Sequence, residues 1–192
     1  MGMSGNTLFR SYVSSRDDQT EGTSSPRRNI SAGVVTVWKP LKEDNPRLFK
    51  FWDLNQKYLY LVENTLVADV KTSGSPEQLI AMLPNKSLAM AQQPFFMGPE
   101  QKKSCLSCVK SENGQYQIEL KEKDIKDLYH DPKNGKAFTF YCKSAGNGNT
   151  CSFESAEFQG WFLSTSSEAK KPIGLSQKGG PQNILFYFER KS

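Results

Sequence analysis

The sequence has little of what enzymes and membrane proteins need. It contains a single histidine, His130, and no Gly-x-Ser-x-Gly, phosphate-loop or paired-carboxylate pattern. One histidine without an identifiable nucleophile is poor support for a catalytic triad. No apolar run comes near the roughly 20 residues that a membrane helix requires. We therefore expect a protein that is neither an enzyme nor inserted in a membrane, and that holds no cofactor.

The N-terminal region also lacks the apolar segment of a secretory signal peptide. Met1–Arg28 carries polar and charged residues throughout, whereas a signal peptide has an apolar stretch of roughly 7–15 residues. This absence predicts that the chain is made as a soluble cytoplasmic product. The sequons at Asn29 and Asn85 are then expected to stay unmodified, because they matter only in the secretory pathway.

Cysteine is scarce, and its spacing does not fit a secreted disulfide scaffold. The 4 cysteines are Cys105, Cys108, Cys142 and Cys151. Cys105 and Cys108 lie in a strand pattern, where residues three apart point to opposite faces, so a zinc site is disfavoured. Cys142 and Cys151 flank a Gly/Asn-rich hairpin loop and could face each other across it. We expect free thiols in the cytosol, with a disulfide between these two as the alternative after release into an oxidising space.

Charge of one sign is not concentrated in long blocks. The 25 basic and 20 acidic residues are interspersed and leave a net charge of +5. Long basic blocks of the kind found in nucleic-acid-binding tails do not occur, so no nucleic-acid partner is expected.

What the sequence does have is a succession of short apolar runs separated by turn residues. About twelve runs recur at roughly 8–12-residue spacing, which is typical of a β-sandwich or barrel. They are 48–52, 58–61, 66–68, 78–83, 94–97, 105–109, 116–120, 137–142, 152–154, 161–163, 172–175 and 184–188. Only 122–129 looks helical, with Ile125, Leu128 and Tyr129 on one face. The pattern predicts one all-β domain over residues 47–192 with one short helical turn.

Residues 1–46 differ from this domain. Ser14–Thr20 and Thr23–Arg28 lack the hydrophobic density that would offset the entropy of ordering. One apolar island, Val34–Trp38, could pair as a strand or act as a linear motif. We interpret residues 1–46 as a disordered leader or propeptide.

Several segments, in the same order along the chain, resemble the interleukin-1 family. They are 50–61 (KFWDLNQKYLYL) with 66–68, 96–98 with 105–111 (CLSCVKS), 120–129 (LKEKDIKDLY), 153–156 with 161–163, and 186–188 (FYF). The first resembles the opening strands of both the receptor-antagonist and the interleukin-36 branches. The second and the last look like the antagonists, and the third looks like an interleukin-36 agonist. The fourth is similar to the family's central signature, although Gln159 stands where proline is common.

The resemblance implies a β-trefoil of about twelve strands, release without a signal peptide, and an immunoglobulin-domain receptor with its accessory chain as partners. Trp52, Gln56 and Tyr187 match antagonist positions that face the receptor, and Trp52 also stands at a strand-to-turn edge, where large aromatics often serve as anchors. Leu185 lies where a charged residue often distinguishes agonists from antagonists. Trp161, on an apolar strand, is expected to be structural instead.

The sequence leaves the sign of signalling open. We expect a monomeric agonist that promotes inflammatory NF-κB signalling, because the long leader resembles a precursor that is activated by a cut near Lys42. The alternative is an antagonist that occupies the receptor without recruiting the accessory chain. A β-trefoil could also bind heparin or glycans, here through Lys102-Lys103 and Arg190-Lys191. A nuclear role of the uncleaved form would depend on Pro26–Arg28, which is too short for a convincing import signal.

Overall fold

Strands dominate the part of the chain that the structure describes. The computed structural model describes residues 45–71, 74, 76–101, 103–133 and 135–191. Of the predicted leader, residues 1–44 lie outside the described residues, including the apolar island at 34–38. The first strand begins at Arg47, and the division of the chain at residue 46 stays a prediction.

The predicted apolar runs fall on strands. In chain order these are β1 (Arg47–Asp53), β2 (Lys57–Val62), β3 (Thr65–Val70), β4 (Ile80–Pro84), β5 (Pro94–Pro99), β6 (Ser104–Lys110), β7 (Tyr116–Glu122), β8 (Thr139–Ser144), β9 (Cys151–Ser155), β10 (Trp161–Ser164), β11 (Lys171–Pro172), β12 (Gly174–Gln177) and β13 (Phe186–Arg190). The run 172–175 is divided between β11 and β12 because the chain changes partner there. Ile173 donates its backbone N–H to the carbonyl of Leu66 on β3, at 2.9 Å, whereas Gly174 pairs with Ser164 on β10.

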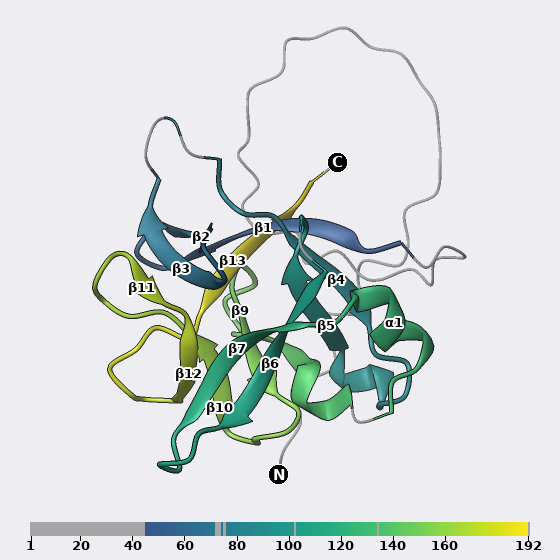
Figure 1. Ribbon diagram of the computed structural model, residues 1–192. Coiled ribbons are helices and arrows are strands. Elements are labelled where there is room, and N and C mark those ends of the chain that lie inside the picture. Colours follow the sequence, from purple (N-terminus) through teal and green to yellow (C-terminus); the bar gives the residue numbers. More distant parts are fainter. Residues whose placement is uncertain (1–44, 72–73, 75, 102, 134, 192) are drawn as a thin grey trace, which may run out of the picture.

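Six of the strands close into a barrel. β1 pairs with β4 and β13, β5 pairs with β4 and β8, and β9 pairs with β8 and β13, all antiparallel. Between pairs of barrel strands the chain leaves for a hairpin, which is β2–β3, β6–β7 or β10–β12. The order of strand, hairpin and strand thus occurs three times along the chain (Figure 1). This arrangement is a β-trefoil and confirms the predicted fold.

Phenylalanine fills the barrel. The residues of β1 are alternately buried and half-buried, so one side of the strand faces the interior. Phe51 on this side has ring centroids of Phe153, Phe186 and Phe188 at 5.3, 6.5 and 5.6 Å. Burial of each such side chain contributes roughly 1.5–3 kcal/mol. The three elements β1, β9 and β13 are therefore held together by one aromatic cluster.

The predicted helical turn begins later than expected. α1 (Ile125–His130) starts after Asp124, whose carboxylate accepts a hydrogen bond from the backbone N–H of Lys126 at 2.9 Å and so caps the helix. Leu128 is buried and packs with Phe96 in a small second cluster beside β4 and β5. In the part of the chain that the structure describes, none of the helices has the length and hydropathy of a membrane span.

Candidate functional site

The turn between β1 and β2 is held from its inner side by a buried ion pair. Asp53 is 0% exposed and Lys57 is 2% exposed. Asp53 Oδ1 accepts hydrogen bonds from the backbone N–H groups of Asn55 and Lys57 at 2.8 and 2.9 Å, and Oδ2 lies 3.4 Å from Lys57 Nζ. Gln56 has a φ of 59° and donates its N–H to the Asp53 carbonyl at 3.1 Å. The carboxylate therefore fixes a turn conformation that a non-glycine residue rarely adopts.

The same carboxylate is connected to the segment that leads into β13. Thr165 Oγ1 donates a hydrogen bond to Asp53 Oδ2 at 2.7 Å. Thr165 and Asn183 exchange backbone hydrogen bonds at 2.9 and 3.0 Å, and Asn183 Nδ2 donates to the carbonyl of Leu185 at 2.8 Å. A continuous polar network, from Asp53 and Lys57 through Thr165 to Asn183, thus joins the β1–β2 turn to the start of β13.

On the outer face of the same strands, three aromatic rings lie side by side. Trp52 is the register partner of Tyr58 on β2 and of Tyr187 on β13. The Trp52 ring stacks on both, with centroid distances of 5.6 and 5.7 Å and interplanar angles of 24° and 15°. All three side chains are half-buried. In the described part of the chain, the main core and the hydrophobic side chains packed against it include none of the three. We call Trp52, Tyr58 and Tyr187 the aromatic stack.

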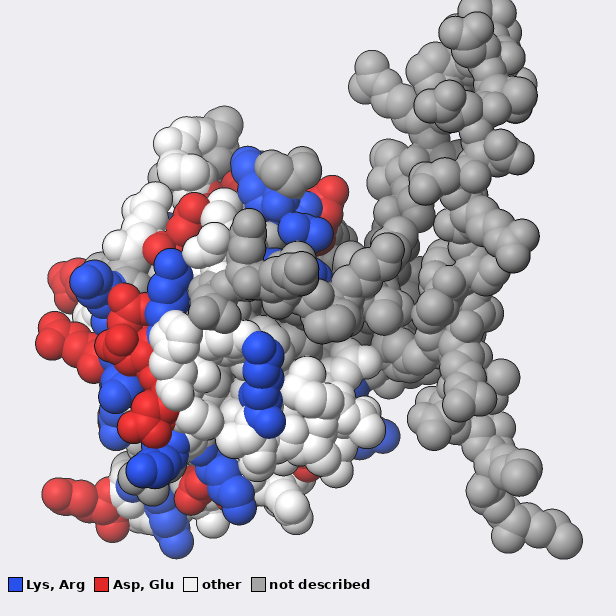
Figure 2. Space-filling model, turned by 90° about the vertical axis from the view of Figure 1, so that its right-hand side faces the viewer, with Lys and Arg blue, Asp and Glu red and all other residues white. Residues whose placement is uncertain are grey.

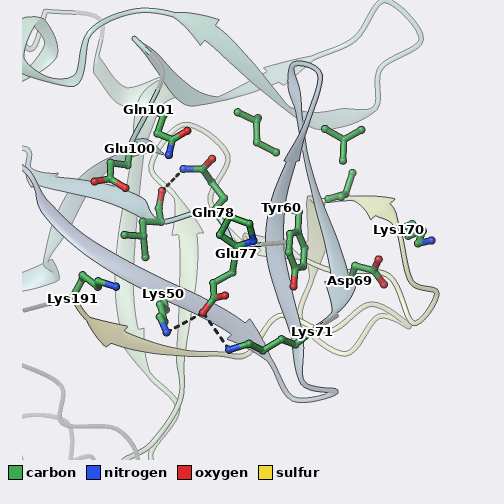
Figure 3. A pocket seen from close by; sticks show the side chains of 15 residues that line it. Lys50, Tyr60, Asp69, Lys71, Glu77, Gln78, Glu100, Gln101, Lys170 and Lys191 are labelled. Atoms are coloured by element: carbon green, nitrogen blue, oxygen red, sulfur yellow. Dashed lines mark hydrogen bonds and ion pairs between the residues drawn. The ribbon is translucent and has the colours of Figure 1, made fainter. Parts of the chain in front are cut away.

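A groove of about 1000 Å³ borders the aromatic stack at Lys71. Lys71 Nζ lies 5.4 Å from the ring centroid of Tyr58 and 3.6 Å from Glu77 Oε1. Lys50 Nζ approaches the same oxygen at 2.9 Å, and Figure 3 shows both ammonium groups directed at this carboxylate. The hydrogen bond from Lys50, followed by weaker contributions that include the charge of Lys71, lowers the pKa of Glu77 to about 2. Other lining residues are Tyr60, Asp69, Lys170 and Lys191.

The structure brings most of the predicted receptor-facing residues to one surface. Trp52 and Tyr187 belong to the aromatic stack, and Gln56 is exposed in the turn between Trp52 and Tyr58. Leu185 is half-buried and lies outside the stack, before β13. Sequence reasoning did not find Tyr58, because its position beside Trp52 depends on the register of the hairpin. The receptor contacts themselves stay predictions.

Trp161 belongs to a second aromatic group that does contact the core. Its ring centroid lies 4.8 Å from that of Tyr116, which in turn lies 4.3 Å from that of Phe158. All three side chains pack against the main hydrophobic core. The predicted structural role of Trp161 is therefore confirmed.

The cysteines form two pairs with different geometry. Cys105 lies in the small cluster beside Leu128, whereas Cys108 lies in the main core, so they occupy opposite faces of β6 as predicted. Cys142 and Cys151 lie on the paired strands β8 and β9 and share the main core. All four thiols are free. Among the described residues, no group of three or more His, Cys, Asp or Glu side chains is placed to hold a metal ion.

Charged side chains are mixed on the face that Figure 2 shows. Lys and Arg lie among Asp and Glu there, without a continuous basic surface. Of the predicted basic clusters, Lys103, Arg190 and Lys191 are exposed, and Lys102 lies outside the described residues. A heparin site depends on a concentration of positive charge, and a role of these clusters in heparin or glycan binding stays a prediction.

Fold and site together define a class of protein: a β-trefoil with an aromatic stack on its outer face. The family model Interleukin-1 / 18 matches residues 74–190. Human interleukin-36 alpha is 34% identical over 149 residues, which cover 76% of this chain and 92% of that relative. Human interleukin-1 receptor antagonist protein is 36% identical over 160 residues, which cover 80% of this chain and 86% of that relative.

A solved structure agrees with these relatives. The NMR structure of the pro-inflammatory cytokine interleukin-36alpha matches with a TM-score of 0.64 and 31% sequence identity, covering 81% of this chain and 100% of that one. The chain therefore belongs to the interleukin-1 family, whose members are signalling ligands that bind receptors and are not enzymes.

Proposed function

We propose that this chain, as a monomer, binds an immunoglobulin-domain receptor of the interleukin-1 or interleukin-36 type through the aromatic stack and Gln56, and thereby promotes inflammatory NF-κB signalling. The aromatic stack is the observation that carries the proposal. Trp and Tyr are enriched among the residues that dominate binding energy at protein interfaces. None of these three rings belongs to the main core or is packed against it. All three are half-buried side chains on neighbouring strands.

The polar network beneath the stack supports the same proposal. Asp53 holds the turn that carries Gln56, and the network continues to Leu185, directly before the strand that carries Tyr187. A surface that is fixed before binding loses less conformational entropy when the complex forms. Leu185 would then act mainly through its position at the end of this network, next to the proposed receptor-binding surface.

An agonist also needs a second surface for the accessory chain. The segment 120–129, which resembles interleukin-36 agonists, forms the end of β7 and most of α1. Figure 1 shows α1 on the other side of the barrel from the β2–β3 hairpin. Lys126, Asp127 and His130 are exposed on this helix. A receptor bound at the aromatic stack would leave α1 available to a second chain, which favours the agonist.

The antagonist remains the second candidate because of a specific similarity. The human relative that is 36% identical to this chain is named a receptor antagonist, and the sequence likeness to antagonists includes the β13 residues Phe186–Phe188. In this case the aromatic stack would occupy the receptor, and the accessory chain would not be recruited.

We further propose that the chain is a cytoplasmic precursor that reaches the extracellular space without a signal peptide. The sequon residue Asn85 is 1% exposed. Its Nδ2 donates to Thr139 Oγ1 at 2.9 Å, and its Oδ1 accepts from the N–H and hydroxyl of Ser87 at 3.0 and 2.6 Å. A glycan on this nitrogen would have to leave the protein interior, so glycosylation at Asn85 is incompatible with the fold.

This second proposal is tested by forcing the chain through the secretory pathway. With a signal peptide attached, we expect a glycosylated and misfolded product, and Ser87→Ala, which removes the sequon but keeps Asn85, should restore folded protein. Folded, secreted protein that carries a glycan at Asn85 would contradict the proposal.

The proposed function is tested with the full chain and a form that begins near Lys42. Each is applied to NF-κB reporter cells that carry interleukin-1 family receptors, alone and together with interleukin-36 alpha. We expect that only the short form, and not the full chain, activates the reporter. Receptor binding that blocks interleukin-36 alpha without signalling would establish the antagonist instead, and no binding to any family receptor would refute the proposal.

A further inference from the structure

Cys142 and Cys151 lie diagonally across the β8–β9 ladder. Cys151 pairs with Ser144, and Cys142 pairs with Phe153, so the two cysteines are offset by two positions and share one face of the sheet. Cys151 is 0% exposed and Cys142 is 9% exposed, both in the main core. Their thiols are hydrogen-bonded to each other.

The two thiols of this pair differ in acidity, unlike those of the other pair. The hydrogen bond from Cys142 lowers the pKa of Cys151 in spite of its burial. The same hydrogen bond, together with burial, raises the pKa of Cys142 well above its ordinary value. Burial also raises the pKa of both Cys105 and Cys108 to about 12. Cys151 is therefore the sulfur best able to become a thiolate, which is the nucleophilic form.

We infer that Cys142 and Cys151 form a dithiol–disulfide site that closes when the protein meets hydrogen peroxide or a similar two-electron oxidant. The Cys151 thiolate attacks one peroxide oxygen and releases hydroxide, which leaves a sulfenic acid on Cys151. The Cys142 sulfur then attacks the Cys151 sulfur, and the departing hydroxide takes the Cys142 proton to form water. One peroxide is reduced to two waters after the first hydroxide is protonated, and two thiols are oxidised to one disulfide.

The proposed cross-link lies next to an exposed loop and next to the strand that carries Tyr187. The disulfide would close the segment between residues 142 and 151, whose residues 143–149 are exposed. Cys151 is also the register partner of Phe186 on β13, directly before Tyr187. We expect the cross-link to raise the melting temperature by about 5 °C, because it restricts the unfolded chain.

The experiment titrates the reduced, full-length chain with hydrogen peroxide. We expect the free thiols, counted after denaturation, to fall from the 4 present in the sequence to about two, with a mass loss of about 2 Da for one disulfide. Peptide mapping without reductant should find the link between Cys142 and Cys151. A Cys105→Ser/Cys108→Ser variant should still form it, and Cys142→Ser should instead gain oxygen at Cys151.

Three results would overturn the inference: an unchanged mass at peroxide levels that oxidise a free thiol peptide, a link through Cys105 or Cys108, or oxygen adducts on the wild type in place of a link. The readout is made without any receptor. Its failure would therefore leave the proposed function untouched, and failure of receptor binding would not affect this site.

Discussion

Trp52 and Trp161 are alike in burial but differ in what lies around and beneath them. Both are half-buried residues of β-strands, and both contact a tyrosine ring. Trp161 and its neighbours rest on the hydrophobic core. Trp52 rests on the two tyrosines of the aromatic stack, above a turn held by the Asp53 carboxylate. Burial alone thus fails to separate an aromatic residue that packs on the core from one that does not, whereas the identity of its neighbours separates them.

The largest expected effect tests the polar support beneath Trp52. Asp53→Ala leaves the Lys57 ammonium buried without its carboxylate, so we expect the free energy of unfolding to fall by about 3–5 kcal/mol. Urea denaturation at neutral pH measures the change. Asp69→Ala, at a less buried carboxylate of the neighbouring groove, is the control and should change stability by less than about 1 kcal/mol. Equal effects of the two substitutions would show that the buried network does not hold the turn.

The next effect compares the two tryptophans directly. Trp161→Ala removes a ring that packs on the core, so we expect a loss of about 2–4 kcal/mol in the free energy of unfolding. Trp52→Ala removes only stacking with two surface tyrosines, and we expect a loss of about 1 kcal/mol. Both are measured by the same denaturation. Equal losses of unfolding free energy would contradict the distinction between Trp161, which packs on the core, and Trp52, which does not.

The smallest expected effect concerns the groove beside the stack. Glu77 has a folded pKa of about 2, below its ordinary value of 4.5, so its charge stabilises the folded state above about pH 4.5. This contribution is lost as the pH falls towards 2. Glu77→Gln should therefore flatten the pH dependence of the unfolding free energy between pH 4.5 and 2. Because Lys50 and Lys71 are partly exposed and solvent screens both ion pairs, we expect a change well below what the full pKa shift would give, less than about 1 kcal/mol. Glu100→Gln, in the same groove, is the matched control and should keep the wild-type pH dependence. If Glu77→Gln also kept the wild-type pH dependence of the unfolding free energy, the lowered pKa of Glu77 would be contradicted.

Local patterns in the sequence were sufficient for the strands and for several individual residues. The alternation of residues in β1 places Phe51 inside and Trp52 outside. The same rule separates Cys105 from Cys108. The start of α1 was placed too early, because Glu122 is the last residue of β7 and Lys123 still donates its backbone N–H to the carbonyl of Lys103 before the cap at Asp124.

Contacts between distant segments could not be derived from such patterns. From the sequence, Lys57 would be expected to be an exposed lysine next to a turn. It is buried instead, and its ammonium donates hydrogen bonds to the backbone carbonyls of Ser166 and Glu168. Trp52 and Tyr187 are adjacent because β1 pairs with β13 where the barrel closes. Period-two alternation places Tyr58 on the outer face of β2, but only the register of the hairpin sets it opposite Trp52.

The most direct test of the account is receptor binding by two matched tryptophan variants. Surface plasmon resonance would compare the wild-type chain, Trp52→Ala and Trp161→Phe on ectodomains of interleukin-1 family receptors. We predict that Trp52→Ala weakens binding about 30-fold, which corresponds to about 2 kcal/mol, while Trp161→Phe stays within about threefold of the wild type. Wild-type affinity in a folded Trp52→Ala variant would contradict the claim that the aromatic stack is the receptor-binding surface.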